Sequence, residues 1–396
     1  MKSIIVLNAG SSSLKFALFP AEVQGGSDPD VPLVTGQVDG LGAHPMLTLK
    51  SADSKSQTPL AIDHLSLEDQ HRSALEAVLM ALREGRPSLK IVAAGHRIVH
   101  GGQVYSAPIR IDADTLETLR RFTPLAPLHQ PHNLRGIKVL EELIPGLPQV
   151  GCFDTAFHRT QPEIAQQFAI PRDLTENGVR RYGFHGLSYD YISRKLESVL
   201  GERAKGAVII CHLGSGSSAC ALREGKSVAS TMGFTALDGL MMGTRTGNID
   251  PGVLLYLMQV KGMDAKAIET LLYKQSGLLG VSGLSQDMRT LLDSDQPQAQ
   301  EAVALYSYRL VREIGSLMAA AGGFDALVFT GGIGENAAQI RAQVVAGLKW
   351  AGVHLNEDNN ANNATRIEAQ WARIPVAVIP TNEEAMIARY TRERIA

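Results

Sequence analysis

The sequence SIIVLNAGSSSLKFAL, residues 3–18, has an approximate repeat in AVIICHLGSGSSACAL, residues 207–222. When Gly10 is set on Gly214, the apolar run before the turn, the small polar residues within it and the Ala-Leu after it coincide. Gly and Ser at such a turn expose backbone N–H groups and hydroxyls, which can hold phosphate oxygens. The repeat predicts two strand hairpins, and therefore a duplicated fold with one nucleotide between its halves.

Either turn alone could be no more than a tight turn, but the pair favours phosphate binding. No G-x-x-x-x-G-K-[ST] is present, and no G-x-G-x-x-G opens a helix after the first strand, which excludes a P-loop and argues against a dinucleotide-binding Rossmann unit. Phosphate held by two hairpins on opposite domains is typical of the actin, heat-shock-protein and sugar-kinase superfamily.

Elsewhere, apolar runs of strand length alternate with helical spacing, which indicates an α/β class. Helices are expected over 67–82, 134–143 and 298–321, and strands over 91–94, 149–153, 326–329 and 376–379. Polar loops are expected over 22–32, 51–59 and 356–363. We predict a two-domain duplicated actin-like (ribonuclease H-like) fold with a nucleotide cleft between the domains, one made of 1–153 plus 384–396 and the other of 154–383.

The composition of the 396 residues excludes several classes of protein. A formal net charge of −2 gives no argument for nucleic acid or for an anionic membrane surface. Three cysteines without C-x-x-C spacing fit free thiols in a reducing compartment. No apolar run approaches the ~18 residues of a membrane span, and the N-terminus does not read as a signal peptide. The sequence therefore predicts a soluble cytoplasmic protein.

A third glycine turn, Gly331-Gly332-Ile333-Gly334, follows a predicted strand and precedes a predicted helix. Its small residues would leave a flat slot for a purine or a ribose, and the start of the helix would favour negative charge. Taken alone, this turn is a weak signal.

Together with these turns, further motifs make the resemblance specific. The sequence resembles the acetate kinase family at segments that occur in the family's order: 8–15, 95–102, 153–158, 180–186, 211–218, 242–251, 330–336 and 381–384. The resemblance implies the reaction ATP + acetate ⇌ ADP + acetyl phosphate, on a two-domain homodimer that uses Mg²⁺ (or Mn²⁺).

The chemistry of that reaction explains the charged residues. A carboxylate with a pKa of about 4 to 5 is already ionised at neutral pH, so no general base is needed. Because one anion must attack another, the site has to supply positive charge and alignment. Arg97 and Arg245 each stand among small residues and could donate two parallel bonds to a carboxylate or phosphate. Out of context, either arginine could instead form a surface salt bridge, and a lone His185 could be purely structural.

The resemblance also assigns roles to individual residues. It puts Arg97, Arg245, His185 and Asp154 at the catalytic centre, where Asp154 would orient metal-bound water or an arginine rather than act as a base. It assigns the metal to Asn8 and Glu383, and the methyl end of acetate to Val99, Leu128 and Phe184. It assigns the nucleotide to two sets of residues: Asn8, Ser12, Lys15, His212, Gly214, Ser215 and Gly216 at the hairpins, and Gly331, Gly332, Ile333, Gly334 and Asn336 at the third turn. A zinc site is disfavoured, because His96 and His100 lie in a strand-like stretch and no H-E-x-x-H occurs.

The sequence departs from the family pattern at three positions. Ala236 replaces a proline that would touch the acetate methyl group, Ser215 replaces a usual Asn, and Asn248 replaces a usual Asp. The smaller Ala236 could admit one more methylene, so a propionate or other short-chain fatty acid kinase is the close alternative. A nucleotide-gated ATPase of the actin or chaperone kind is the alternative from a different class, although such a protein needs no second anion site.

Overall fold

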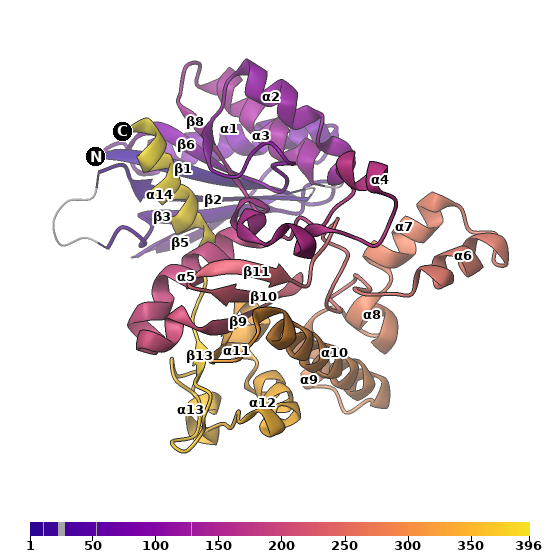
Figure 1. Cartoon of the computed structure of the whole chain (residues 1–396). Coiled ribbons are helices and arrows are strands. Elements are labelled where there is room, and N and C mark those ends of the chain that lie inside the picture. Colours follow the sequence, from indigo (N-terminus) through magenta and orange to yellow (C-terminus); the bar gives the residue numbers. More distant parts are fainter. Residues whose placement is uncertain (11, 23–27, 53, 128) are drawn as a thin grey trace. The chain divides into compact units, whose positions relative to one another are not determined.

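The computed structural model describes residues 1–10, 12–22, 28–52, 54–127 and 129–396 (Figure 1). The chain folds as two compact units, which we call the first unit (Met1–Phe157 with Asn382–Ala396) and the second unit (His158–Thr381). These bounds lie a few residues from those of the predicted domains, and they assign both Asp154 and Glu383 to the first unit. The division into functional domains at residues 153/154 and 383/384 stays a prediction.

A mixed sheet forms the centre of the first unit. Its strands are β1 (Lys2–Ala9), β2 (Ser13–Pro20), β3 (Val34–Asp39), β4 (Met46–Ser51), β5 (Ser54–Pro59), β6 (Lys90–Ile98), β7 (Ile109–Arg110) and β8 (Gln149–Phe153). They lie in the order β5-β4-β3-β2-β1-β6-β8-β7. β1 and β2 form the antiparallel hairpin that the sequence predicts, while β1, β6 and β8 run parallel.

Helices on this sheet explain why β1 is an unbroken apolar run. The helices of the first unit are α1 (Leu67–Gly85), α2 (Ala113–Arg120), η1 (Thr123–Leu125), α3 (Gln130–Leu143) and α14 (Glu383–Ile395), and η2 (Ala156–Thr160) spans the junction. α1 and α3 pack on the sheet through the buried cluster that holds Ile5 and Leu7, whereas α14 (yellow in Figure 1) packs on β1, β6 and β8. A Cβ at Gly95 would lie 2.3 Å from Thr391 Oγ1, so a glycine in β6 allows α14 to approach this closely.

The second unit is built around a sheet with the order β11-β10-β9-β12-β13. Its strands are β9 (Ala207–Leu213), β10 (Ser217–Arg223), β11 (Lys226–Ser230), β12 (Ala326–Thr330) and β13 (Val376–Val378). Its helices are η3 (Glu163–Gln166), α4 (Arg172–Glu176), α5 (Gly186–Leu200), η4 (Gly201–Lys205), α6 (Pro251–Gln259), α7 (Ala265–Lys274), α8 (Gly277–Ser282), α9 (Met288–Leu292), α10 (Pro297–Ala321), α11 (Gly331–Asn336), α12 (Ala338–Gly347), η5 (Lys349–Ala351) and α13 (Glu357–Ala361). α10 packs on β9, β10 and β11 and ends at Gly322, whose φ of +64° is the left-handed conformation that favours glycine.

The two sheets confirm the predicted duplication of an α/β fold. β3-β2-β1-β6-β8 and β11-β10-β9-β12-β13 share the same succession of pairings, which is antiparallel, antiparallel, parallel and parallel. In both sheets the Gly/Ser turn joins the second strand to the third of this series. The repeat in the sequence therefore reflects a repeat in topology.

Two of the predicted loops are wrong. Residues 51–59 hold the end of β4 and all of β5, whose residues are exposed on both faces and so give no apolar alternation in the sequence. Residues 356–363 contain α13, and Asn360 is buried there, where its side-chain amide oxygen and its backbone carbonyl oxygen accept hydrogen bonds from Arg341. The third predicted loop, 22–32, lies partly outside the described residues. In the part of the chain that the structure describes, no helix is both long enough and apolar enough to cross a membrane.

Candidate active site

The carboxyl ends of three parallel strands carry the predicted polar residues of the first unit. Asn8 lies near the end of β1, Arg97 near the end of β6, and Asp154 directly after β8. Ends of parallel strands meet at one edge of a sheet, which brings these side chains together. Asn382 caps α14 by accepting the backbone N–H of Ala385, and this cap places Glu383 in the first turn of the helix at the same edge.

The guanidinium of Arg97 is held by oxygen atoms on several sides. It forms two hydrogen bonds with Asp154, one from Nη2 to Oδ2 and one from Nε to Oδ1 at 3.2 Å. Its Nη1 donates to Asn8 Oδ1 at 3.4 Å, and Glu383 Oε2 lies 3.7 Å from Nε. Asp154 is 1% exposed, whereas the Arg97 side chain is 19% exposed. The fixed guanidinium therefore keeps part of its surface available to a ligand.

Charge and burial oppose each other in this cluster. Burial raises the pKa of the Asp154 carboxyl, Arg97 lowers it, and Glu383 raises it further. Burial alone would lower the pKa of Arg97, but Asp154 and then Glu383 raise it above its usual value, so the guanidinium stays charged. Asp154 thus holds the Arg97 guanidinium by charge and by hydrogen bonds, while its role of orienting an arginine or metal-bound water stays a prediction.

The first Gly/Ser turn lies beside this cluster. Gly10 N–H donates to Ser13 O at 2.8 Å and closes the turn, and Lys15 stands directly across the hairpin from Asn8. Ser12 is exposed. Of the residues predicted to contact the acetate methyl group, Val99 is buried and its N–H donates to Asn133 Oδ1 at 3.0 Å. Leu128 lies outside the described residues.

In the second unit, an unusual turn presents Phe184 and His185. Gly183 has a φ of +76° and His185 a φ of +57°, so two left-handed residues flank the buried Phe184 at the start of α5. The buried His158 contacts Phe184 O through Nε2 at 2.8 Å, and its Nδ1 contacts Ser227 Oγ at 2.9 Å. Because a carbonyl oxygen can only accept a hydrogen bond, His158 carries its proton on Nε2 and donates it to Phe184 O, which holds this turn in place.

His185 and Arg245 both lie against the second Gly/Ser turn. A Cβ at Gly216 would be 3.4 Å from His185 Nε2 and 3.4 Å from Arg245 Nη2. The ring of His185 stacks on that of His212, with 4.3 Å between the ring centroids. Arg245 Nη1 donates to Ala236 O at 2.7 Å, which joins the guanidinium to the loop that departs from the family pattern. An imidazole and a guanidinium therefore meet where the sequence predicts a phosphate.

Hydrogen bonds of the backbone and of the Asn248 side chain brace the loops around Arg245. Gly243 N–H donates to Ser215 O at 3.1 Å, which ties the arginine's loop to the Gly/Ser turn. Asn248 Oδ1 accepts from Gly239 N–H at 3.0 Å, and its Nδ2 donates to Glu313 at 3.2 Å. Asn248 thus fastens the end of the loop that carries Ala236.

A pocket of about 930 Å³ joins the second Gly/Ser turn to the third glycine turn. The predicted residues on its wall are Gly214, Ser215, Gly332, Ile333 and Asn336. Gly331 has a φ of +77°, and a Cβ there would lie 2.7 Å from Leu213 O, so the turn requires glycine. Glu335 Oε1 accepts the N–H of Gly331 at 2.9 Å, while Gly334 is buried. The pocket is large enough for a nucleoside and ends at a phosphate-type turn.

The structure thus brings the predicted residues together in two groups, one in each unit. Several residues that position them were missed, because their spacing in the sequence carries no sign of their partners. These are His158 behind Phe184, Ser218 and Tyr189 behind His185, and Glu335 in the third turn. His158, Ser218 and Glu335 lie in segments that the resemblance singles out, which is the available signal for them, whereas Tyr189 lies in none of these segments.

Among the described residues, no group of three or more His, Cys, Asp or Glu side chains could hold a metal ion. Mg²⁺ needs few protein ligands, prefers oxygen, and keeps several waters. Asn8 and Glu383 supply an amide and a carboxylate oxygen on either side of Arg97, which fits that preference.

Comparisons with known proteins agree along the whole chain. The model of the acetokinase family matches residues 3–389. An acetate kinase of Rhodopseudomonas palustris is 50% identical over 390 residues, which cover 98% of this chain and 97% of the relative. Among solved structures, a propionate kinase from Francisella tularensis has a TM-score of 0.92 at 40% identity, with both chains covered completely. The acetate kinase of Porphyromonas gingivalis has a TM-score of 0.88 at 37% identity, again over all of both chains.

Proposed function

The chain belongs to the acetokinase family, and from this premise we infer that it is an acetate kinase, a phosphotransferase that reversibly transfers a phosphoryl group from ATP to a carboxyl group. The observation that carries this inference is the meeting of His185 and Arg245 at the second Gly/Ser turn, which borders a pocket of nucleoside size. A cation and an imidazole at a phosphate turn suit a transfer in which negative charge has to be neutralised.

We propose direct in-line transfer. Acetate is ionised at neutral pH and attacks without a base, so the protein has to align two anions and reduce their repulsion. Arg97 and Arg245 supply positive charge, and His185 contacts the phosphoryl group during transfer. Asp154 acts through Arg97, because its two hydrogen bonds fix the plane of the guanidinium.

Nucleotide and metal are proposed to bind through the remaining residues. Asn8 and Glu383 would hold Mg²⁺, which neutralises charge on the ATP phosphates when bound. The phosphates would meet the hairpin residues Ser12, Lys15, His212, Gly214, Ser215 and Gly216, and the nucleoside would occupy the pocket that the third glycine turn lines. Val99, Leu128, Phe184 and Ala236 would surround the methyl group of acetate.

One assay separates this function from its alternatives. Trapping of the acyl phosphate as a hydroxamate is measured with acetate, with propionate and without acid, and ADP release is measured in parallel. An acetate kinase forms hydroxamate with acetate and little ADP without acid, whereas a nucleotide-gated ATPase releases ADP regardless of acid and forms no hydroxamate. Retention of near-normal turnover by Arg245→Ala would contradict the proposed role of the arginine.

Propionate is the second candidate substrate. The Francisella propionate kinase is a close structural neighbour, and Ala236 places a small side chain in the loop whose carbonyl Arg245 binds. A single methylene is worth about 1–3 kcal/mol in discrimination, so a small change in the pocket alters the preference. We expect Ala236→Pro to raise the ratio of kcat/KM for acetate over propionate; an unchanged ratio would show that position 236 does not touch the substrate.

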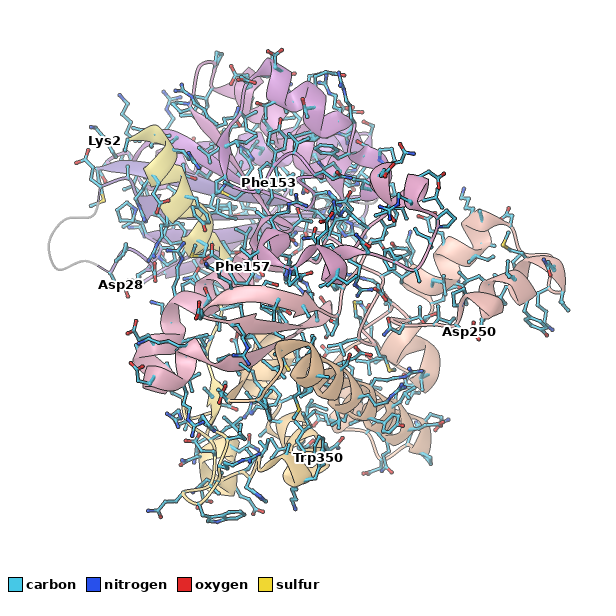
Figure 2. The ribbon with its side chains drawn as sticks, in the orientation of Figure 1. Lys2, Asp28, Phe153, Phe157, Asp250 and Trp350 are labelled. Atoms are coloured by element: carbon cyan, nitrogen blue, oxygen red, sulfur yellow. The ribbon has the colours of Figure 1, made fainter. Side chains whose placement is uncertain are left out.

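We also propose a homodimer that uses α6. Its residues Val253, Leu255, Tyr256 and Met258 are between 38% and 54% exposed, and none of its side chains is buried. Asp250, labelled in Figure 2, caps the helix, and α6 stands out from the body of the second unit with α7. Exposed apolar side chains on one helix are typical of a subunit interface. Light scattering should give twice the chain mass for the wild type and the chain mass for Leu255→Asp/Met258→Asp. A cytoplasmic location is proposed as well, because the ATP supply is there and the three cysteines are buried and form no disulfide among the described residues.

A further inference from the structure

A chain of buried hydroxyl groups ends on the ring of His185. Ser218 Oγ lies 2.8 Å from His185 Nδ1, and Tyr189 Oη forms a short hydrogen bond with the same Ser218 Oγ. Ser218 belongs to β10 and Tyr189 to α5, and both are completely buried. The ring of His185 is therefore held from two different elements through one oxygen atom.

The neighbouring histidine repeats this arrangement. His212 Nδ1 lies 2.8 Å from Ser188 Oγ, which lies 2.8 Å from Thr381 Oγ1. Each of the two stacked imidazoles thus has Nδ1 on a serine hydroxyl that is bonded to a second hydroxyl. The repeated arrangement indicates that the hydroxyl groups determine which nitrogen of each imidazole carries the proton, rather than merely packing against the rings.

The direction of the chain follows from the chemistry of its groups. A phenol is a stronger donor and a weaker acceptor than an alkyl hydroxyl, so Tyr189 donates to Ser218. Burial raises the pKa of Tyr189 well above its usual value, which keeps the phenol proton in place. Ser218 has one hydrogen atom, and with Tyr189 as its donor that atom is directed to His185 Nδ1.

We propose that Tyr189 and Ser218 are positioning residues that hold His185 as the neutral tautomer with its proton on Nε2. Nε2 is the atom that faces the second Gly/Ser turn, since a Cβ at Gly216 would lie 3.4 Å from it. Arg245 Nη2 lies equally close to that point and disfavours a second positive charge there. The imidazole then offers an N–H donor to a phosphoryl oxygen, while Arg245 supplies the charge. The catalytic part of this proposal depends on the proposed role of His185, but the tautomer does not.

The tautomer is measured directly by ¹⁵N NMR of the full-length protein labelled at histidine. His185→Gln identifies the His185 signals, and spectra are recorded at about pH 8.5, two units above the usual histidine pKa of about 6.5. We expect the wild type to show a protonated Nε2 and an unprotonated Nδ1. Ser218→Ala removes the donor, so its His185 should show a mixture of tautomers. A wild-type signal with the proton on Nδ1 would overturn the proposal.

Kinetics tests the catalytic consequence. Partners that orient an active-site imidazole in metal sites are worth about 10- to 100-fold, and we expect kcat of Ser218→Ala to fall within this range while KM for ATP and acetate changes little. Tyr189→Phe should lower kcat in the same direction and provides a second variant if Ser218→Ala folds poorly. Unchanged kcat in both variants would show that the hydroxyl chain has no positioning role.

Tyr306→Phe is the matched control. Tyr306 Oη bonds Ser217 Oγ at 2.9 Å, so this variant removes an equally buried phenol hydroxyl from the serine next to Ser218 on β10. Its kcat and His185 tautomer should match the wild type; a fall equal to that of Tyr189→Phe would mean that any lost hydroxyl on this strand has the same effect. Wild-type turnover in His185→Gln would reject the proposed role of His185 and leave the tautomer result standing.

Discussion

Replacement of Asp154 by asparagine tests whether this carboxylate orients the Arg97 guanidinium for catalysis. The change keeps the shape of the side chain and removes the charge that accepts two hydrogen bonds from the guanidinium. If Asp154 acts only through Arg97, then Asp154→Asn should harm the enzyme when Arg97 is present and do nothing further when Arg97 is replaced by alanine.

The structure sets the size of the effect. Breaking a buried ion pair costs about 3–5 kcal/mol. Arg97 is 19% exposed and keeps Glu383 at 3.7 Å as a second anion, so we expect the lower end of that range, about 3 kcal/mol. If this loss appears in the transition state, kcat/KM for acetate falls by about 160-fold, at 1.36 kcal/mol for each factor of ten.

The assay is a double-mutant cycle of Asp154→Asn, Arg97→Ala and the double variant, with kcat/KM measured for acetate. We expect the double variant to equal Arg97→Ala, which gives a coupling energy of about 3 kcal/mol. Additive losses would refute the reasoning, because Asp154 would then act on substrate or metal without Arg97. Asp30→Asn is the control, since Asp30 is another buried carboxylate, 3.5 Å from Arg389 in the same unit, and its loss should leave kcat/KM unchanged.

Other predictions concern stability and nucleotide binding. Gly183→Ala should lower the free energy of unfolding by more than about 3 kcal/mol, because φ is +76° and the new Cβ would lie 2.6 Å from the His158 ring. Gly283→Ala, which is in the left-handed helical region at φ +64° and ψ +9° with no atom within 4 Å of the new Cβ, should cost only about 1 kcal/mol when both variants are unfolded in urea. Arg341→Met removes the donor to Gly334 O, so we expect KM for ATP to rise several-fold while KM for acetate is unchanged; equal rises would contradict a local role. Stability should also fall as the pH drops from about 6.5 towards 4, because burial lowers the pKa of three histidines to about 4 and the unfolded chain then binds more protons. Urea midpoints that do not change between these pH values would contradict the buried neutral state of His96, His100 and His158.

Much of the fold could be predicted because its signals are local. The two hairpins, the strand 149–153 and the long helix over 298–321 follow from apolar periodicity and glycine turns, and the structure confirms them within a residue or two. The strand over 54–59 could not be predicted, because its side chains are exposed and its stability comes from backbone pairing with β4. The spacing of apolar residues in a sequence reflects which side chains are buried. A strand such as β5, which buries no side chain, therefore produces no such pattern.

The site shows the same limit in another form. Residues that would touch ligands lie in short motifs with glycine around them, and the sequence indicates them. The groups that hold these residues in place can come from distant parts of the chain, as Ser218 does for His185 across 33 positions. Their pairing depends on which strand lies next to which helix, and this becomes known only from the tertiary structure.

The two units also show how one topology can carry two kinds of chemistry. β6 and β12 occupy equivalent places in their sheets, yet Arg97 stands near the end of β6, while Gly331 directly follows β12. A charged side chain at the first strand end is held by neighbouring oxygens. At the end of β12, the left-handed Gly331 lies so close to Leu213 O that no side chain fits. The residues that follow it line the nucleoside-sized pocket. The duplication therefore supplies two turns suited to phosphate, and the residue at the end of the adjacent parallel strand decides whether that edge of the sheet offers charge or space.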